Sequence, residues 1–263
     1  DEAAIMDAAR KSGVETLPAG VSIRHTTEEV TMHDDPATVF RRKKDSSMGV
    51  GLTMMKNSEG DAFISAGSTG ALLTGATLIT KRVRGIRRAA MAPVIPTVTG
   101  KAVLIDCGAN AECTAEYLVQ FAYLGSFYAK SMLGLENPRV ALLNIGTEPE
   151  KGTDLQREAY GLLNAAKDIN FIGNIEAKEA VKGGCDVIVC DGFSGNVMLK
   201  TIEGVGSFAA SALKGIFKKN LLTKIAALLV MPGLNAFKAM LDPNKVGGTA
   251  FIGVSKPVLK AHG

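Results

Sequence analysis

The side chains best suited to hold an anion lie in one short turn, Ser65-Ala66-Gly67-Ser68-Thr69-Gly70, directly after the apolar run Ala62-Phe63-Ile64. Glycine lets backbone N–H groups approach a ligand closely, and serine and threonine hydroxyls can donate hydrogen bonds. We expect a helix from about Gly70 to Lys81, whose free N–H groups favour negative charge. The turn therefore predicts a phosphate site made of Ser65, Gly67, Ser68, Thr69 and Gly70. An ordinary capped strand-to-helix turn is the alternative.

The pattern of an apolar strand, a small polar turn and a helix returns three times. Strands are predicted over 103–107, 140–145 and 186–191, and the turns that follow them are 108–110, 146–152 and 192–196. In a parallel sheet these turns emerge together at the carboxyl edge, where ligands bind. They add further candidate substrate-binding residues: Gly108, Asn110, Asp191 and Ser194. Asp106 and Asp191 are candidates to orient the reacting groups.

Two side chains in these turns could act in catalysis. Lys151 stands between carboxylates and a glycine in the turn 146–152, where it could neutralise charge on phosphate or on an oxyanion. Pairing with Glu148 or Glu150 at the surface is the alternative. Asn196 opens a helix and could donate a hydrogen bond to a carbonyl oxygen.

Composition excludes several classes of function. Tryptophan is absent and aromatic residues make up 5% of the chain, which argues against nucleic-acid binding by base stacking. The four cysteines form no CxxC pair, so neither a zinc site nor a disulfide framework is expected, and no metal or cofactor is predicted. No apolar run approaches the ~20 residues that span a bilayer, and no secretory peptide is visible. Cytoplasmic conditions fit best.

Three surface patches could meet partners. The basic run 41–44 could meet a phosphate or an acidic partner, or it could equally be a solvated face. The run 81–88 suits a helix C-terminus, but its five positive charges exceed what capping requires, so it too could bind an acidic partner. The apolar run Ile225–Met231 is surrounded by lysines at 214, 218, 219, 224 and 238. Such a tip can lie in an anionic membrane surface, or the helices can pack in a dimer bundle.

The remaining pattern predicts mostly helices. They are expected over 37–55, 114–133, 153–167, 196–219 and 221–241, the last broken near Pro232-Gly233. A weak strand is expected near 21–24, short strands near 169–174 and 256–259, and a glycine turn with a strand over 246–253.

The chain resembles one family closely, the bacterial phosphate acyltransferases of phospholipid synthesis (PlsX). The matching segments follow in the same order along nearly the whole chain: RRKKDSSM at 41–48, ISAGSTGA at 64–71, LIDCGAN at 104–110, LNIGTE at 143–148, NFIGN at 170–174, DGFSGNV at 191–197 and KAHG at 260–263. Family members also have a preceding acidic, glycine-rich loop and a further helix after KAHG, so we expect this chain to be truncated at both ends and its site list to be incomplete.

The resemblance implies an α/β fold, a three-layer α/β/α sandwich with a mostly parallel sheet. This is the fold of isocitrate and isopropylmalate dehydrogenases and of phosphotransacetylases. We expect one domain over 1–263, with a protruding helical hairpin at 197–241 that contacts a second copy or a membrane.

The implied activity is transfer of a long-chain acyl group from acyl carrier protein to inorganic phosphate, giving acyl phosphate. The resemblance also implies a homodimer associated peripherally with the inner face of the cell membrane. Carrier protein is strongly acidic, so we expect it to dock on the basic residues Arg41, Arg42, Lys43, Lys44, Arg84, Arg87 and Arg88. Alternatives are an NAD(P)-dependent dehydrogenase of the same fold and a non-catalytic membrane scaffold. Acyl-chain length preference is beyond the sequence.

Overall fold

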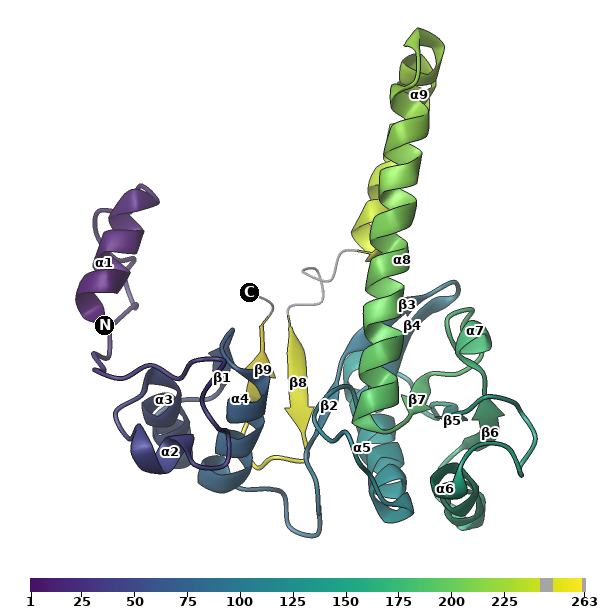
Figure 1. Cartoon of the computed structure of the whole chain (residues 1–263), viewed down its shortest axis with the longest axis horizontal. Coiled ribbons are helices and arrows are strands. Elements are labelled where there is room, and N and C mark those ends of the chain that lie inside the picture. The colour runs from purple at the N-terminus through teal and green to yellow at the C-terminus, as the bar shows by residue number, and fades with distance from the viewer. Residues whose placement is uncertain (242–247, 262–263) are drawn as a thin grey trace. The chain divides into compact units, whose positions relative to one another are not determined.

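The computed structural model describes residues 1–241 and 248–261. The chain divides into two compact units, which are treated separately below (Figure 1). The first consists of Asp1–Val83 and Val254–Ala261, and the second of Arg84–Gly253. The expectation of a single domain over 1–263 stays a prediction.

The second unit is built on a five-stranded sheet. The order across the sheet is β3 (Val94–Thr97), β4 (Gly100–Ile105), β7 (Val187–Val189), β5 (Val140–Leu143) and β6 (Phe171–Ile175). Only β3 is antiparallel to its neighbour, β4; the other pairs are parallel. A separate antiparallel pair joins β2 (Ala90–Ala92) to β8 (Thr249–Ile252). The mostly parallel sheet predicted from the sequence is confirmed.

Helices cover both faces of this sheet. Val103 and Ile105 of β4 pack with α5 (Ala115–Leu133) and α6 (Asp154–Ala165). Ala102 and Leu104, which alternate with them, pack on the opposite face with α7 (Ala177–Ala180) and the start of α8 (Gly192–Lys218). Because strands buried on both faces need apolar residues at every position, β4 and β7 read as continuous hydrophobic runs. The unit is the predicted α/β/α sandwich.

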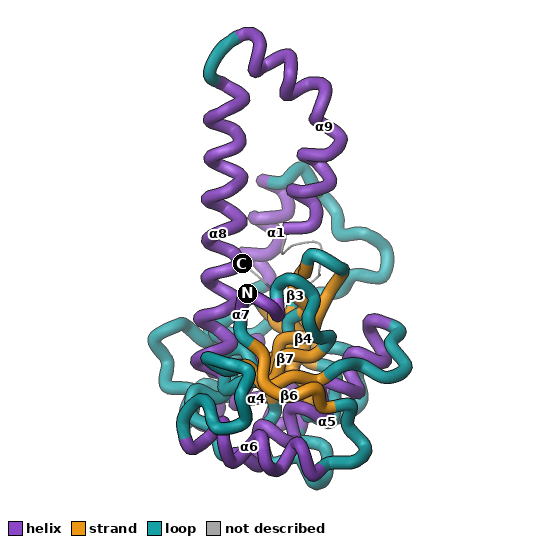
Figure 2. The backbone as a smooth tube through the Cα atoms, turned by 90° about the vertical axis from the view of Figure 1, so that its right-hand side faces the viewer, coloured by secondary structure: helices purple, strands orange, loops and turns teal. Residues whose placement is uncertain are grey.

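The predicted helical hairpin is present. Helix α8 extends beyond the sheet, and α9 (Leu221–Leu241) returns beside it (Figure 2). The predicted break near Pro232-Gly233 is wrong, because α9 continues through Pro232. A proline removes one N–H donor and perturbs the preceding turn, which kinks a helix without always ending it. Residues 246–247 of the glycine turn predicted to follow lie outside the described residues, as does the side chain of Lys238.

The first unit is mainly helical. Its elements are α1 (Glu2–Lys11), α2 (Val39–Arg42), α3 (Ser47–Lys56), β1 (Phe63–Ser65), α4 (Thr69–Gly75), the π-helical segment Ala76–Thr80 and β9 (Val258–Lys260). Strand β9 pairs with β1 in parallel. Val39, Leu52, Leu72 and Ala76 are fully buried and form the centre of its core.

Two predictions for this unit are wrong. The helix predicted over 37–55 is two helices, because the chain leaves helical geometry at Lys43 and Ser46 caps α3 by accepting a hydrogen bond from the Gly49 N–H (3.3 Å). The weak strand near 21–24 is absent: within the described chain this segment pairs with no strand, and Val21 is 53% exposed. A β-branched residue without a ladder partner does not make a strand.

Candidate active site

Three turns of the second unit emerge at one edge of its sheet. Strands β4, β7 and β5 are neighbours and parallel, so their carboxyl ends lie side by side. The turns that follow them hold nearly all the candidate residues of this unit, as the sequence predicts.

Asp106, which follows β4, organises the first turn. Its carboxylate is fully buried and accepts four N–H bonds, from the Met91 N–H (2.8 Å), the Cys107 N–H (2.7 Å), the Asn110 N–H (2.6 Å) and the Asn110 side-chain amide (2.9 Å). Burial raises the pKa of Asp106 above its ordinary value, while these hydrogen bonds act in the opposite direction. Asp106 is therefore a positioning residue for the turn.

The same geometry restricts what Asn110 can do. Its side-chain nitrogen donates to Asp106 and also to the Ala89 carbonyl oxygen (2.8 Å). Both amide protons are thereby used within the protein, since an amide nitrogen carries two. The substrate-binding role predicted for Asn110 stays a prediction, and its side-chain nitrogen is already engaged.

The first turn of α8 packs directly against this loop. A Cβ at Gly195 would lie 2.0 Å from the Asp106 carbonyl oxygen, and one at Gly192 would lie 2.6 Å from the Asn110 carbonyl oxygen. Both positions therefore require glycine. The Gly108 backbone has φ +92°, and a Cβ there would lie 3.7 Å from Asn196 Cγ. The structure thus brings the predicted residues Gly108 and Asn196 together.

Asp191 caps α8. Its carboxylate accepts hydrogen bonds from the Ser194 N–H and from the Ser194 hydroxyl, both at 2.8 Å. An N-terminal carboxylate suits the helix dipole and fixes the first turn, which Asn196 directly follows. Because the Ser194 hydroxyl donates its hydrogen bond to Asp191, these two side chains are engaged in holding the turn in place. A direct substrate contact by either stays a prediction.

Lys151 lies in the loop after β5, and asparagine side chains fix this loop at two points. The Asn144 amide donates to the Lys151 carbonyl oxygen (3.0 Å), and the Asn174 amide donates to the Glu148 carbonyl oxygen (2.8 Å). The Lys151 side chain is exposed and, among the residues that the structure describes, forms no ion pair with Glu148 or Glu150. Its ammonium group is thus left for a ligand, on a loop that is itself held in place.

The Ser65–Gly70 turn belongs to the first unit. Ser65 Oγ accepts from the Gly67 N–H (3.1 Å), and Ser68 caps α4 by accepting from the Ala71 N–H (3.4 Å). Ser68 is buried, whereas Gly70 is exposed. The capped strand-to-helix turn is therefore present, and anion binding by it stays a prediction.

Lys260 is a cation beside this turn to which the sequence analysis assigned no role. Its Nζ donates to the Ala66 carbonyl oxygen (3.1 Å) and to the Ala261 carbonyl oxygen (2.6 Å). Partial burial lowers the pKa of Lys260. Its position follows from the pairing of β9 with β1, which no local pattern reveals; only the motif 260–263 marked it. His262 and Gly263 of that motif lie outside the described residues.

The predicted docking residues differ in how far they are already engaged. Lys43 Nζ lies 2.6 Å from Asp34 Oδ2, and Arg42 donates to Thr38 Oγ1 (2.8 Å). Arg87 pairs with Glu116, and the Arg88 guanidinium lies 5.6 Å from the centre of the Tyr117 ring. The other three docking residues, Arg41, Lys44 and Arg84, are exposed. Docking by these seven residues stays a prediction.

The described part of the chain lacks two kinds of feature. Residues 1–241 and 248–261 contain no cluster of three or more His, Cys, Asp or Glu side chains that could hold a metal. None of the helices described there is both long and apolar enough to span a bilayer.

Comparison with known proteins identifies the family. A family model described as "Fatty acid synthesis protein" matches residues 1–263. A phosphate acyltransferase of Alkaliphilus oremlandii is 51% identical over 243 residues, 92% of this chain and 72% of that protein. One from Thermoanaerobacterium thermosaccharolyticum is 46% identical over 93% of this chain and 73% of its own length. The chain belongs to the phosphate acyltransferase family. The resemblance seen in its motifs is confirmed.

Solved structures agree on the fold. The EutD phosphotransacetylase from Staphylococcus aureus matches with a TM-score of 0.58 at 16% identity, covering 100% of this chain and 78% of that chain. A phosphotransacetylase from Streptococcus pyogenes matches with a TM-score of 0.55 at 19% identity, over 85% and 63% of the two chains. The predicted phosphotransacetylase-like fold is confirmed.

Proposed function

We propose that this member of the phosphate acyltransferase family transfers a long-chain acyl group from acyl carrier protein to inorganic phosphate. Phosphate attacks the thioester carbonyl directly, the C–S bond breaks, and the carrier thiol and acyl phosphate are released. Phosphate is the nucleophile, so no serine or cysteine of the chain needs to be acylated. The observation that carries the proposal is the fixed placement of Asn196 and of the exposed Lys151 on neighbouring turns of one sheet edge.

The second unit supplies groups for the developing negative charge. Helix α8 begins at Gly192 and not at Asn196, where the sequence predicted its start. The N–H groups of Gly192, Ser194 and Gly195 are bound within the protein, so the group offered to an oxyanion is the side-chain amide of Asn196. Lys151 brings a positive charge on a loop that Asn144 and Asn174 hold. Donors placed in advance stabilise a transition state without being reorganised during the reaction.

The first unit contains a turn that is suited to an anion. We assign phosphate binding to Ser65–Gly70, where the Thr69 hydroxyl and the exposed Gly70 lie at the start of α4. Lys260 adds a nearby positive charge, and its bond to the Ala66 carbonyl oxygen ties it to that turn (3.1 Å). A serine- and glycine-rich turn with one lysine suits a small anion such as phosphate.

The partners follow from charge and apolar exposure. Acyl carrier protein, which is acidic, would dock on the exposed arginines and lysines of 41–44 and 84–88. Helix α9 of the hairpin exposes Leu228 (69%) and Leu229 (80%), and Lys218, Lys219 and Lys224 are nearby along the chain. These features support peripheral contact with an anionic membrane from the cytoplasmic side. The homodimer remains a proposal.

The test follows carrier thiol release from palmitoyl carrier protein with and without inorganic phosphate. Release that needs phosphate and yields acyl phosphate is expected. Lys151→Ala and Asn196→Ala should each lower the rate about 10²–10³-fold, the usual cost of one oxyanion donor. Release by water alone would indicate a thioesterase, and binding without any release would indicate a scaffold.

A further inference from the structure

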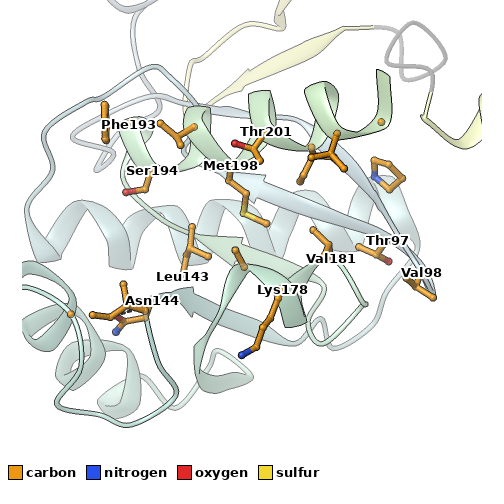
Figure 3. A pocket seen from close by; sticks show the side chains of 18 of the residues that line it. Thr97, Val98, Leu143, Asn144, Lys178, Val181, Phe193, Ser194, Met198 and Thr201 are labelled. Atoms are coloured by element: carbon orange, nitrogen blue, oxygen red, sulfur yellow. Dashed lines mark hydrogen bonds between the residues drawn. The ribbon is translucent and has the colours of Figure 1, made fainter. Parts of the chain in front are cut away.

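A large apolar groove runs along α8 in the second unit. Its volume is about 1090 Å³. One wall is a stripe of α8 with helical spacing, namely Ser194, Met198, Thr201, Val205 and Ala209. The facing wall comes from the ends of β3 and β5 and from α7, with Val98, Leu143 and Val181 among its side chains (Figure 3).

The polar groups along this groove are largely satisfied within the protein. The Lys178 ammonium pairs with Glu176 (2.8 Å), and Gln156 Oε1 accepts from the Thr153 N–H (3.0 Å). The Ser194 hydroxyl is bound to Asp191 (2.8 Å). What the groove offers an occupant is therefore mainly hydrocarbon surface, which favours an apolar ligand.

One end of the groove adjoins the loop that carries Lys151. Asn144 and Gly152 line this end, and the Asn144 amide donates to the Lys151 carbonyl oxygen (3.0 Å). Asn196 lies on the other face of α8 and is not part of the lining. In Figure 3, Phe193, Ser194 and Asn144 lie at one end, and Thr97 and Val98 lie at the other. An alkyl chain attached to a carbonyl at the end near Lys151 would continue directly into the groove.

We propose that this groove binds the acyl chain of the substrate and that its far end, at Ala209 and Val98, limits the chain length. The inference rests on the proposed function for the identity of the acyl donor. The dimensions fit. At 1.5 Å per residue, α8 from Ser194 to Ala209 is about 22 Å long. An acyl layer of a bilayer, half of the hydrocarbon core, is about 15 Å deep.

The first test compares chain-length profiles. Ala209→Leu narrows the far end, whereas Ala210→Leu places the same side chain on the neighbouring exposed position, which is not part of the groove lining. In Ala209→Leu, kcat/KM for the palmitoyl carrier should fall about fourfold for each methylene kept out of the groove. The lauroyl carrier should react as before, and Ala210→Leu should match the unchanged protein with both. Identical profiles for all three proteins would overturn the proposal.

A second measurement does not depend on turnover. The fluorescent fatty acid cis-parinaric acid is titrated into the whole protein without phosphate or carrier. It should bind, and Ala209→Leu should weaken the binding while Ala210→Leu does not. Binding with this pattern in a protein that shows no phosphate-dependent release would leave the groove assignment standing and remove the proposed function. Absence of binding would remove the groove assignment.

A second copy of the chain is the competing occupant. Sedimentation of the same three proteins tests it. If Ala209→Leu dissociates an oligomer and leaves the chain-length profile unchanged, the groove is an interface between copies and the acyl assignment is wrong. An unchanged oligomeric state together with an altered profile supports the assignment.

Discussion

Asn144 and Lys151 are joined across the loop that follows β5, because the Asn144 amide nitrogen donates to the Lys151 carbonyl oxygen at 3.0 Å. The Asn144 side-chain oxygen, Oδ1, accepts from the Ile145 N–H (2.8 Å), so the side chain bridges both ends of the loop. A Cβ at Gly152 would lie 2.6 Å from Asn144 Oδ1, which leaves little room for any other arrangement. The proposed catalytic lysine thus depends on an asparagine seven residues earlier.

We predict that Asn144→Ala lowers kcat by about tenfold to a hundredfold with little change in KM, because misplacing a catalytic group by about 1 Å can cost a hundredfold. The double variant Asn144→Ala/Lys151→Ala should be no slower than Lys151→Ala, since residues that act as a unit are not additive. Steady-state kinetics of the four proteins measure this. Additive losses would show that Asn144 acts independently of Lys151.

Two glycines of α8 should respond oppositely to the same substitution. Gly195→Ala puts a Cβ 2.0 Å from the Asp106 carbonyl oxygen and 2.9 Å from Cys190 Sγ, so the loop or the helix must move. We expect a loss of about 1–3 kcal/mol in the free energy of unfolding, as overpacking usually costs. At Gly204 a Cβ meets nothing within 4 Å, so Gly204→Ala should stabilise the helix by up to about 1 kcal/mol.

Urea unfolding of these two variants beside the unchanged protein measures the difference. Equal destabilisation by both would contradict the close packing of α8 on the loop after β4. Gly195→Ala should also lower the rate of turnover, because Asn196 is its neighbour in the same helical turn.

The pairing of Asp34 with Lys43 predicts a pH dependence of the first unit. The Lys43 ammonium, with help from the Thr31 N–H and hydroxyl, lowers the pKa of Asp34 from 3.8 to about 2. Between these values the unfolded chain binds more protons than the folded one, so this contribution is complete above the unfolded pKa and is lost as pH falls through the folded pKa.

Asp34→Asn removes the ionisable group, so the stability of this variant can be compared with that of the unchanged protein as the pH is varied. The urea midpoint of the unchanged protein should exceed that of Asp34→Asn at about pH 6, and the difference should shrink as the pH falls from about 4 to about 2. A difference that stays constant over that range would mean that Asp34 is not paired as described.

The parallel strands and the turns that hold the candidate residues could be predicted because they depend on local signals, whereas the three-layer sandwich followed from the resemblance to a family. The apolar runs at 103–107 and 186–191 favour buried strands, and the small polar turns after them favour a site at the carboxyl edge. That Gly192 and Gly195 lie against the backbone of the loop after β4 is seen only in the structure. Asn196 and Gly108 could be placed at one edge from strand parallelism alone.

The features of the site that the sequence did not predict depend on contacts between residues far apart in the chain. Nothing near Lys260 in the chain shows that β9 pairs with β1 and so brings its ammonium to the Ala66 carbonyl oxygen. The Asn110 side-chain amide donates hydrogen bonds to Asp106 and to the Ala89 carbonyl oxygen. The conformation of the folded loop determines these partners, and the residue type alone does not reveal them. The apolar groove could not be predicted, because it depends on the distance between α8 and the three elements that face it. Sequence periodicity does not determine that distance.

The last prediction concerns the cysteines, which the proposed mechanism leaves without a chemical role. Burial raises the pKa of Cys107, Cys113 and Cys185 to about 12, and it raises the pKa of Cys190 well above its ordinary value. The thiolate is the reactive form, so the folded protein should react with iodoacetamide at about pH 8 far more slowly than a free thiol of pKa ≈ 8.5. Treatment should leave phosphate-dependent carrier release unchanged. The same protein in urea should label at all four positions, which serves as the control. Rapid labelling of the folded protein with loss of activity would identify an activated cysteine and would contradict direct attack by phosphate.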